Sequence, residues 1–96
     1  MIYEQAVLSI QPGREAEFEA AFEAAPAVFA RAEGFHGMEL RRCIEEPSRY
    51  VLLVSWETVE AHTVGFRESP LAGEWRGIVG VFFGSPPEVR HYRTIA

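Results

Sequence analysis

The chain has 96 residues, of which 48% are hydrophobic, and a net charge of −5 at neutral pH. These values fit one globular domain over residues 1–96. They argue against a membrane span, because no apolar run is long enough, and against nucleic-acid binding, which depends on cations that neutralise phosphates. The absence of Lys, Asp and Asn excludes a Schiff-base lysine, a Walker lysine and a Ser-His-Asp triad.

The first third of the chain predicts a strand followed by a helix. Residues 2–10 alternate well enough between apolar and polar for a strand, and a Gln-Pro-Gly turn ends it. Over residues 14–32 apolar side chains recur at helical spacing. Pro26 lies inside this helix and removes one backbone hydrogen bond, so the helix should bend or split there. Gly34 is expected to cap its C-terminal end.

The middle of the chain predicts an antiparallel hairpin. Residues 35–45 fit a second strand, with Met38, Leu40 and Ile44 on one face. A short loop containing proline leads directly into a third, strongly apolar strand over residues 49–56. Two such strands joined by a short loop pair as a hairpin.

The last third predicts helical turns and a final strand. Thr58 is placed to cap a helix, and Ser69 and Pro70 start another, with Ser as the N-cap and Pro at the first helical position. Two prolines precede a last strand over residues 88–95. The resulting βαββαβ order is that of a ferredoxin-like α+β fold, with helices on one face of a four-stranded antiparallel sheet in the order 4-1-3-2.

The third strand also predicts a partner. Its central residues, Val51 to Val54, are apolar on both faces, so both faces favour burial. The helices of one subunit cover only one face of the sheet. We therefore expect a homodimer in which two copies pack through their sheet faces.

Trp56 and His62 form the candidate catalytic site. Trp56 shares a face of the third strand with Leu52, and His62 shares a helix face with Phe66. If these faces point inward, His62 lies in an apolar pocket beside Trp56. Its neutral form is favoured there, and it can act as a general base on a phenol or enol. The alternative interpretation is that Trp56 and His62 are packed core residues.

Aromatic residues are numerous: seven Phe, three Tyr and two Trp. With Leu52 and Phe66, the side chains of Trp75 and Phe22 are predicted to bind a flat aromatic substrate, and plain core packing is again the alternative. His36 and His91 fall on opposite edge strands and cannot share a metal within one subunit. We expect no metal, because no His-Glu pair stands at helical i,i+4 ligand spacing with a third donor nearby. We expect no nucleotide cofactor, because no glycine-rich phosphate loop follows a strand.

The cellular location is predicted from two features of the sequence. Cys43 is the only cysteine and cannot form an internal disulfide, which favours a reducing compartment. The first residues lack the basic and apolar regions of a signal peptide. We therefore expect a cytoplasmic protein.

The whole chain resembles the antibiotic biosynthesis monooxygenase (ABM) family of dimeric α+β barrels. The resemblance rests on four short segments: Gln11-Pro12-Gly13, Gly34-Phe35-His36-Gly37, Ser55-Trp56-Glu57 and Ser69-Pro70. Cofactor-independent oxygenases of this family, which turn polycyclic phenols into quinones, pair the strand Trp with an Asn four residues before it and a Tyr six residues after it. The chain has Leu52 and His62 at these two places.

The resemblance implies an oxygenase that acts on an aromatic phenol or quinol without metal or flavin, with His62 taking the phenolic proton. Haem-degrading members use an Asn, Trp and His set, and the chain has Ala6, Gly65 and Trp75 there, so haem degradation is not implied. The missing amide at Leu52 and the expected lack of an acidic partner for His62 favour a second hypothesis. In that hypothesis the protein is a non-catalytic homodimeric binding module for a small hydrophobic ligand.

Overall fold

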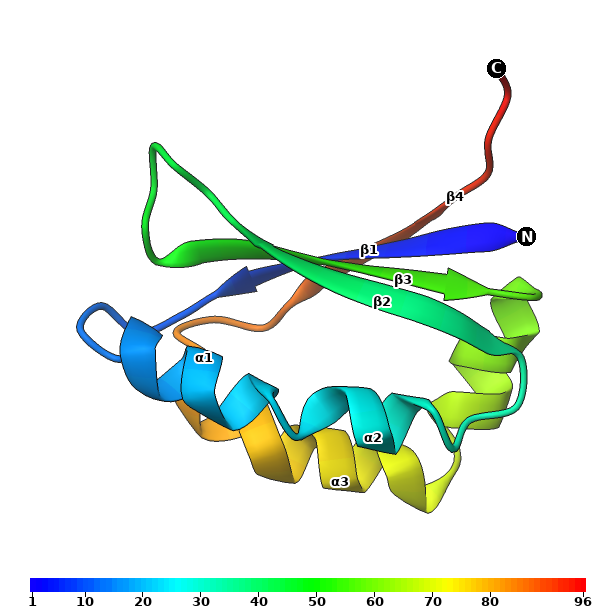
Figure 1. Cartoon of the computed structure of the whole chain (residues 1–96), viewed down its shortest axis with the longest axis horizontal. Helices are drawn as coiled ribbons and strands as arrows, with labels where there is room; N and C mark the ends of the chain where they lie inside the picture. Colours follow the sequence, from blue (N-terminus) through cyan, green and yellow to red (C-terminus); the bar gives the residue numbers. More distant parts are fainter.

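Four antiparallel strands form a sheet, and all of the helices lie on one face of it (Figure 1). The computed structural model describes all 96 residues. The strands are β1 (Ile2–Ser9), β2 (Phe35–Arg42), β3 (Arg49–Trp56) and β4 (Glu88–Tyr92). Their order across the sheet, β2-β3-β1-β4, confirms the predicted ferredoxin-like α+β arrangement.

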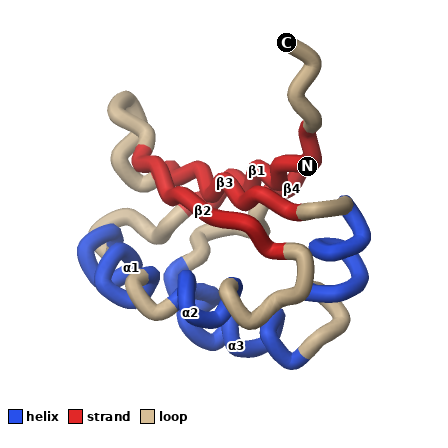
Figure 2. Tube along the Cα trace, turned by 45° about the vertical axis from the view of Figure 1, so that its right-hand side comes forward, coloured by secondary structure: helices blue, strands red, loops and turns tan.

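The helical layer is built from short pieces, seen as blue segments beneath the red sheet in Figure 2. It comprises α1 (Glu15–Phe22), α2 (Ala25–Phe29), the π-helix η1 (Ala61–Phe66), α3 (Pro70–Val79) and the 3-10 helix η2 (Gly80–Phe82). The predicted split at Pro26 is confirmed, because this residue lies in the first turn of α2. At the start of α3 the hydroxyl of Ser69 accepts a hydrogen bond from the backbone N–H of Leu71 at 3.2 Å, as expected for an N-cap.

Some predicted boundaries were wrong. Strand β2 ends at Arg42 rather than at residue 45, so Ile44 lies in the hairpin loop and is 90% exposed instead of sharing a strand face with Leu40. Strand β4 ends at Tyr92 because its partner there is Tyr3, close to the beginning of β1, and the residues beyond have no strand to pair with. Gly34 does not cap a helix, because α2 ends at Phe29.

The inner face of the sheet holds most of the core. Alternate residues of β1 and all even-numbered residues of β3 point toward the helices and are buried: Glu4, Ala6, Leu8, Tyr50, Leu52, Val54 and Trp56. This period of two is the expected pattern for strands covered on one side. Glu4 is the only residue of this set with an ionisable carboxyl group, and it is 5% exposed.

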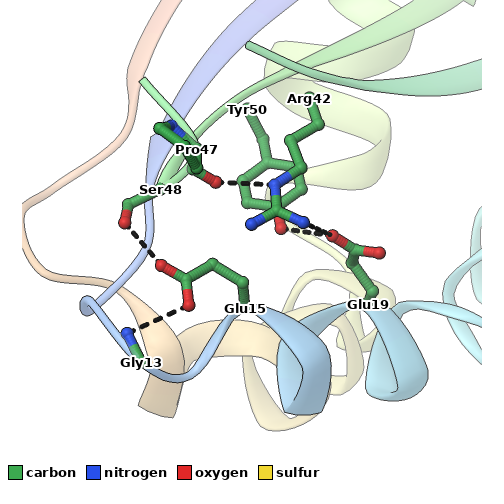
Figure 3. Close-up of polar contacts among 7 residues, drawn as sticks. All are labelled: Gly13, Glu15, Glu19, Arg42, Pro47, Ser48 and Tyr50. Carbon is green, nitrogen blue, oxygen red and sulfur yellow. Dashed lines mark hydrogen bonds and ion pairs between the residues drawn. The ribbon is translucent and has the colours of Figure 1, made fainter. Parts of the chain in front are cut away.

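Two carboxylates of α1 attach this helix to the β2–β3 hairpin (Figure 3). The hydroxyl of Tyr50 donates to Oε2 of Glu19, and Nη1 of Arg42 lies 3.1 Å from the same oxygen. The hydroxyl of Ser48 donates to Glu15. Burial and the neighbouring Glu19 carboxylate raise the pKa of the Tyr50 hydroxyl. These contacts fix α1 against the β2–β3 hairpin.

Gly34 lies in the loop between α2 and β2, where this loop meets Ala61, the first residue of η1. Its φ is +84°, and a Cβ atom added to it would lie 2.8 Å from Cβ of Ala61. Gly13, in the turn after β1, has a similar φ of +92° but open space around it. The two glycines therefore share a backbone conformation and differ in the space available.

We expect Gly34→Ala to lower the free energy of unfolding more than Gly13→Ala. Both variants place a side chain at positive φ, which costs about 1–2 kcal/mol. Only Gly34→Ala also places a Cβ atom against Ala61 of η1, at an additional cost of about 1–3 kcal/mol. Urea unfolding of the two variants measures the difference. Equal losses would contradict the close approach of Gly34 and Ala61.

Candidate functional site

A cavity of about 510 Å³ lies between the inner face of the sheet and the helices. Nine of its 15 lining residues are hydrophobic, and they come from β1, α2, β3, η1, α3, the chain before β4 and β4 itself. The volume lies within the range typical of small-molecule sites. Four ionisable side chains interrupt the apolar wall: Glu4, His62, Arg67 and Arg76.

The corner between β3 and η1 positions His62. The hydroxyl of Thr58 accepts a hydrogen bond from the backbone N–H of Ala61 at 3.1 Å, which confirms Thr58 as a helix-starting residue. The following helix is a π-helix, in which the N–H of Arg67 bonds to the carbonyl of His62 five residues earlier at 3.0 Å. Such turns occur often at functional sites. His62 and Phe66 are both buried against the sheet.

His62 is held by side chains from three strands. Its Nε2 atom lies 3.4 Å from Oε1 of Glu4 on β1, and its Nδ1 atom lies 2.8 Å from Nε2 of His91 on β4. Its ring stacks on Trp56 of β3, with centroids 5.4 Å apart and planes inclined by 19°. The indole N–H of Trp56 donates to the same Glu4 oxygen at 2.9 Å. The four side chains thus form one connected cluster at the cavity wall.

Burial favours the uncharged form of each ionisable group in this cluster. The side chains of His62 and Glu4 are only 7% and 6% exposed. Burial lowers the pKa of His62 to about 4, and the charge of Arg67 and the nearby His91 contribute. Burial likewise lowers the pKa of His91 and raises that of Glu4, although the Trp56 hydrogen bond and Arg67 oppose the latter shift. His62 is therefore neutral at neutral pH.

The residues predicted for the site fall into two groups. Four of them line the cavity: Leu52, His62, Phe66 and Trp75. Trp56 does not line it, because it is fully buried behind His62 and Glu4. Phe22 also lies outside the lining and packs edge-on against Trp75, with centroids 5.9 Å apart. The functional roles of all six residues stay predictions.

Sequence reasoning missed Glu4 and His91. The expectation that His62 has no acidic partner was wrong, because Glu4 faces it from β1. A signal for Glu4 was present, since it shares inward parity with Ala6 and Leu8. His91 lies opposite Glu4 in the β1–β4 register, which the sequence alone does not reveal.

No three His, Cys or Glu side chains converge in a way that could hold a metal ion. Activity without metal or flavin remains a prediction. None of the helices is both long and apolar enough to cross a membrane.

The sequence matches the model of the antibiotic biosynthesis monooxygenase family over residues 1–77. The chain belongs to this family. The Bacillus subtilis protein YczJ, whose function is uncharacterised, is 40% identical over 95 residues, which are 99% of this chain and 100% of YczJ. A crystal structure of a Bordetella bronchiseptica protein assigned to the same family is 49% identical, with a TM-score of 0.97, over 99% of this chain and 97% of that chain.

A more distant structure shares the fold. The Streptomyces coelicolor monooxygenase from ActVA-Orf6, solved in complex with nanaomycin D, is 16% identical to this chain. The two structures superpose with a TM-score of 0.81 over 99% of this chain and 88% of that chain. The resemblance to the ABM family, which was inferred from short segments, is confirmed.

We expect the burial of neutral His62 to make folding sensitive to acid. The unfolded chain binds a proton at the ordinary histidine pKa of 6.5, whereas the folded protein does so only at about 4. Above pH 6.5 this pKa difference costs the folded protein no stability. As the pH falls toward 4, it lowers the free energy of unfolding by up to about 3 kcal/mol. Urea unfolding at several pH values across this window measures it.

Matched variants isolate the contribution of His62 in this experiment. Because its pKa is raised, Glu4 lowers the free energy of unfolding as the pH rises above 4.5, which opposes the effect of His62. His91 changes the free energy of unfolding in the same direction as His62. The slope of the unfolding free energy against pH should therefore become flatter in His62→Gln. It should stay unchanged in His36→Gln, because His36 is on the surface. An unchanged slope in His62→Gln would contradict the prediction.

Proposed function

We propose that the protein is a monooxygenase that oxidises a small aromatic phenol or quinol with dioxygen, without a metal or flavin. The observation that carries this proposal is the buried Glu4–His62 pair set into an apolar, largely aromatic cavity wall. An apolar cavity with a few convergent polar groups and perturbed pKa values is the general form of an enzyme site. The ligand complex of the Streptomyces coelicolor monooxygenase supports a ligand site in this fold.

The shape of the wall supports a flat aromatic substrate. Phe29 and Phe66 are stacked with ring centroids 4.6 Å apart, and Trp75 meets Phe29 edge-on at 5.1 Å. All three side chains line the cavity. Aromatic rings in offset or edge-on contact add about 0.5–1.5 kcal/mol per pair beyond area burial. A ring-shaped ligand would extend this layer.

The polar end of the cavity supports a substrate with a ring hydroxyl. The Glu4–His62 pair can accept the hydroxyl proton, and the positive charge of Arg67 at the cavity favours the resulting anion. The electron-rich ring then reacts with dioxygen. With an anthrone, one oxygen atom becomes the new carbonyl oxygen, and the other leaves as water with the two hydrogens of the ring carbon.

We expect oxygen uptake with a panel of anthrones and hydroquinones, and we expect His62→Ala to lower kcat by about 100-fold with little change in KM. His36→Ala is the matched control, because His36 lies on the surface near Glu57 and away from the cavity. An oxygen electrode measures the rates. Equal rates in wild type and His62→Ala would remove His62 from the mechanism. Quenching of tryptophan fluorescence by an anthrone without any oxygen uptake would favour the binding module instead.

We further propose that two copies pair through the outer faces of their sheets. No helix covers this face, as Figures 1 and 2 show. It nevertheless presents Val51 and Leu53, which one subunit leaves only half-buried, together with Tyr3 and Tyr92, which are 37% and 50% exposed. Apolar side chains left partly exposed on an uncovered sheet face favour a protein interface there.

The wild-type protein should sediment as a particle of twice 10.8 kDa at micromolar concentration. Leu53→Arg should yield a particle of half that mass, because a charge is placed in the centre of the outer face. Ile44→Arg is the control, since Ile44 is 90% exposed but lies in the hairpin loop. A wild-type monomer, or a dimer that survives Leu53→Arg unchanged, would contradict pairing through this face.

A further inference from the structure

Both ring nitrogens of His62 are engaged by other side chains, so His62 has no nitrogen free to meet a ligand. Nε2 faces Glu4 and Nδ1 faces His91. Glu4 is different, because Trp56 and His62 both address its Oε1 atom. Its Oε2 atom has no hydrogen-bond partner in the protein. This atom is therefore not fully buried, because no fully buried side-chain nitrogen or oxygen atom lacks a hydrogen-bond partner. Glu4 also lines the cavity.

We propose that Glu4, His62 and His91 form a proton-transfer chain between the cavity and solvent, in which Glu4 is the group that contacts the ligand's hydroxyl. This inference rests on the proposed function and assigns the path of the proton. The chain crosses three elements, β1, η1 and β4, through contacts of 3.4 and 2.8 Å. It ends at His91, which is only partly buried on an edge strand.

The resting chain is uncharged. In the proposed chain Glu4 is a carboxylic acid whose Oε1–H points at Nε2 of His62, 3.4 Å away, and Nδ1–H of His62 donates to Nε2 of His91. The proton of His91 is then on Nδ1, which has no partner in the protein. This arrangement agrees with the cost of burying charge, because burial raises the pKa of Glu4 and lowers those of both histidines.

Two neighbours define the charge around the chain. The Trp56 indole can only donate, so it holds Oε1 of Glu4 in place whether or not that oxygen carries a proton. Arg67, which follows η1, disfavours positive charge on both histidines and favours negative charge at Glu4 or on a ligand beside it. Arg76 of α3 is the other cation at the cavity.

Each reaction cycle moves one proton along the chain. The ligand's hydroxyl gives its proton to Oε2 of Glu4, while Oε1 gives its proton to Nε2 of His62. Nδ1 of His62 gives its proton to Nε2 of His91, and Nδ1 of His91 releases one proton to water. The ligand becomes an anion and each protein group stays neutral. After reaction with dioxygen, reversal of these steps returns one proton to the dioxygen-derived oxygen atom that leaves as water.

The tautomer of His62 tests the proposal without any substrate. Long-range ¹⁵N–¹H spectra of the wild-type protein at neutral pH distinguish the two neutral tautomers and the cation, and His36→Gln and His91→Gln assign the three histidines. We expect His62 and His91 to carry their protons on Nδ1. A His62 that is cationic, or that carries its proton on Nε2, would overturn the chain. This result does not depend on whether the protein is an oxygenase.

Variants test the path during turnover of an anthrone. Glu4→Gln keeps an oxygen acceptor for Trp56 but cannot pass a proton, so kcat should fall about 100-fold while anthrone binding, measured by tryptophan fluorescence, changes little. His91→Gln should lose activity similarly and regain it when imidazole is added to the buffer. Wild-type rates in Glu4→Gln, or a loss in His91→Gln that imidazole does not relieve, would overturn the proposal. If the wild type consumed no oxygen, the monooxygenase proposal would fail and the tautomers would still decide the chain.

Discussion

Burial of the Glu4 carboxyl group beneath the sheet constrains the rest of the site. A buried polar group is costly unless it is hydrogen-bonded, and a buried charge is more so. Trp56 supplies the nearest donor at 2.9 Å and His62 the next contact at 3.4 Å. These partners come from elements far apart in sequence. The carboxyl group is therefore satisfied only when β3, η1 and β1 are assembled together.

Strand register carries this constraint across the sheet. Glu4 lies opposite Val54 of β3 and opposite His91 of β4, so all three side chains face the helices. A slip of one residue in β4 would turn His91 to the outer face and break its contact with His62. The close approach of Gly34 to Ala61 sets the other boundary, because it fixes the distance between η1 and the end of β3. The site is thus a consequence of sheet pairing and one tight helix contact.

The sequence was informative where local chemistry decides the structure and silent where long-range pairing decides it. The bounds of β3 and the helix break at Pro26 follow from a continuous apolar run and from the missing N–H of proline. Trp56 and His62 could be placed together because they lie on adjacent elements. The partnership of Glu4 and His91 could not, because it depends on the pairing of the first and last strands. Ile44 was misplaced because an apolar side chain in a hairpin loop looks like a strand residue.

Strand β4 presents different side chains on its two faces. Its alternation sends Val89 and His91 toward the helices and Arg90 and Tyr92 toward the outer face. A partner packed on the outer face would contact the second pair and leave the first untouched. Because β4 is an edge strand, His91 can also reach solvent at the side of the sheet instead of through it. Pairing of two subunits and proton exchange with solvent are therefore compatible, since they use opposite faces of the same strand.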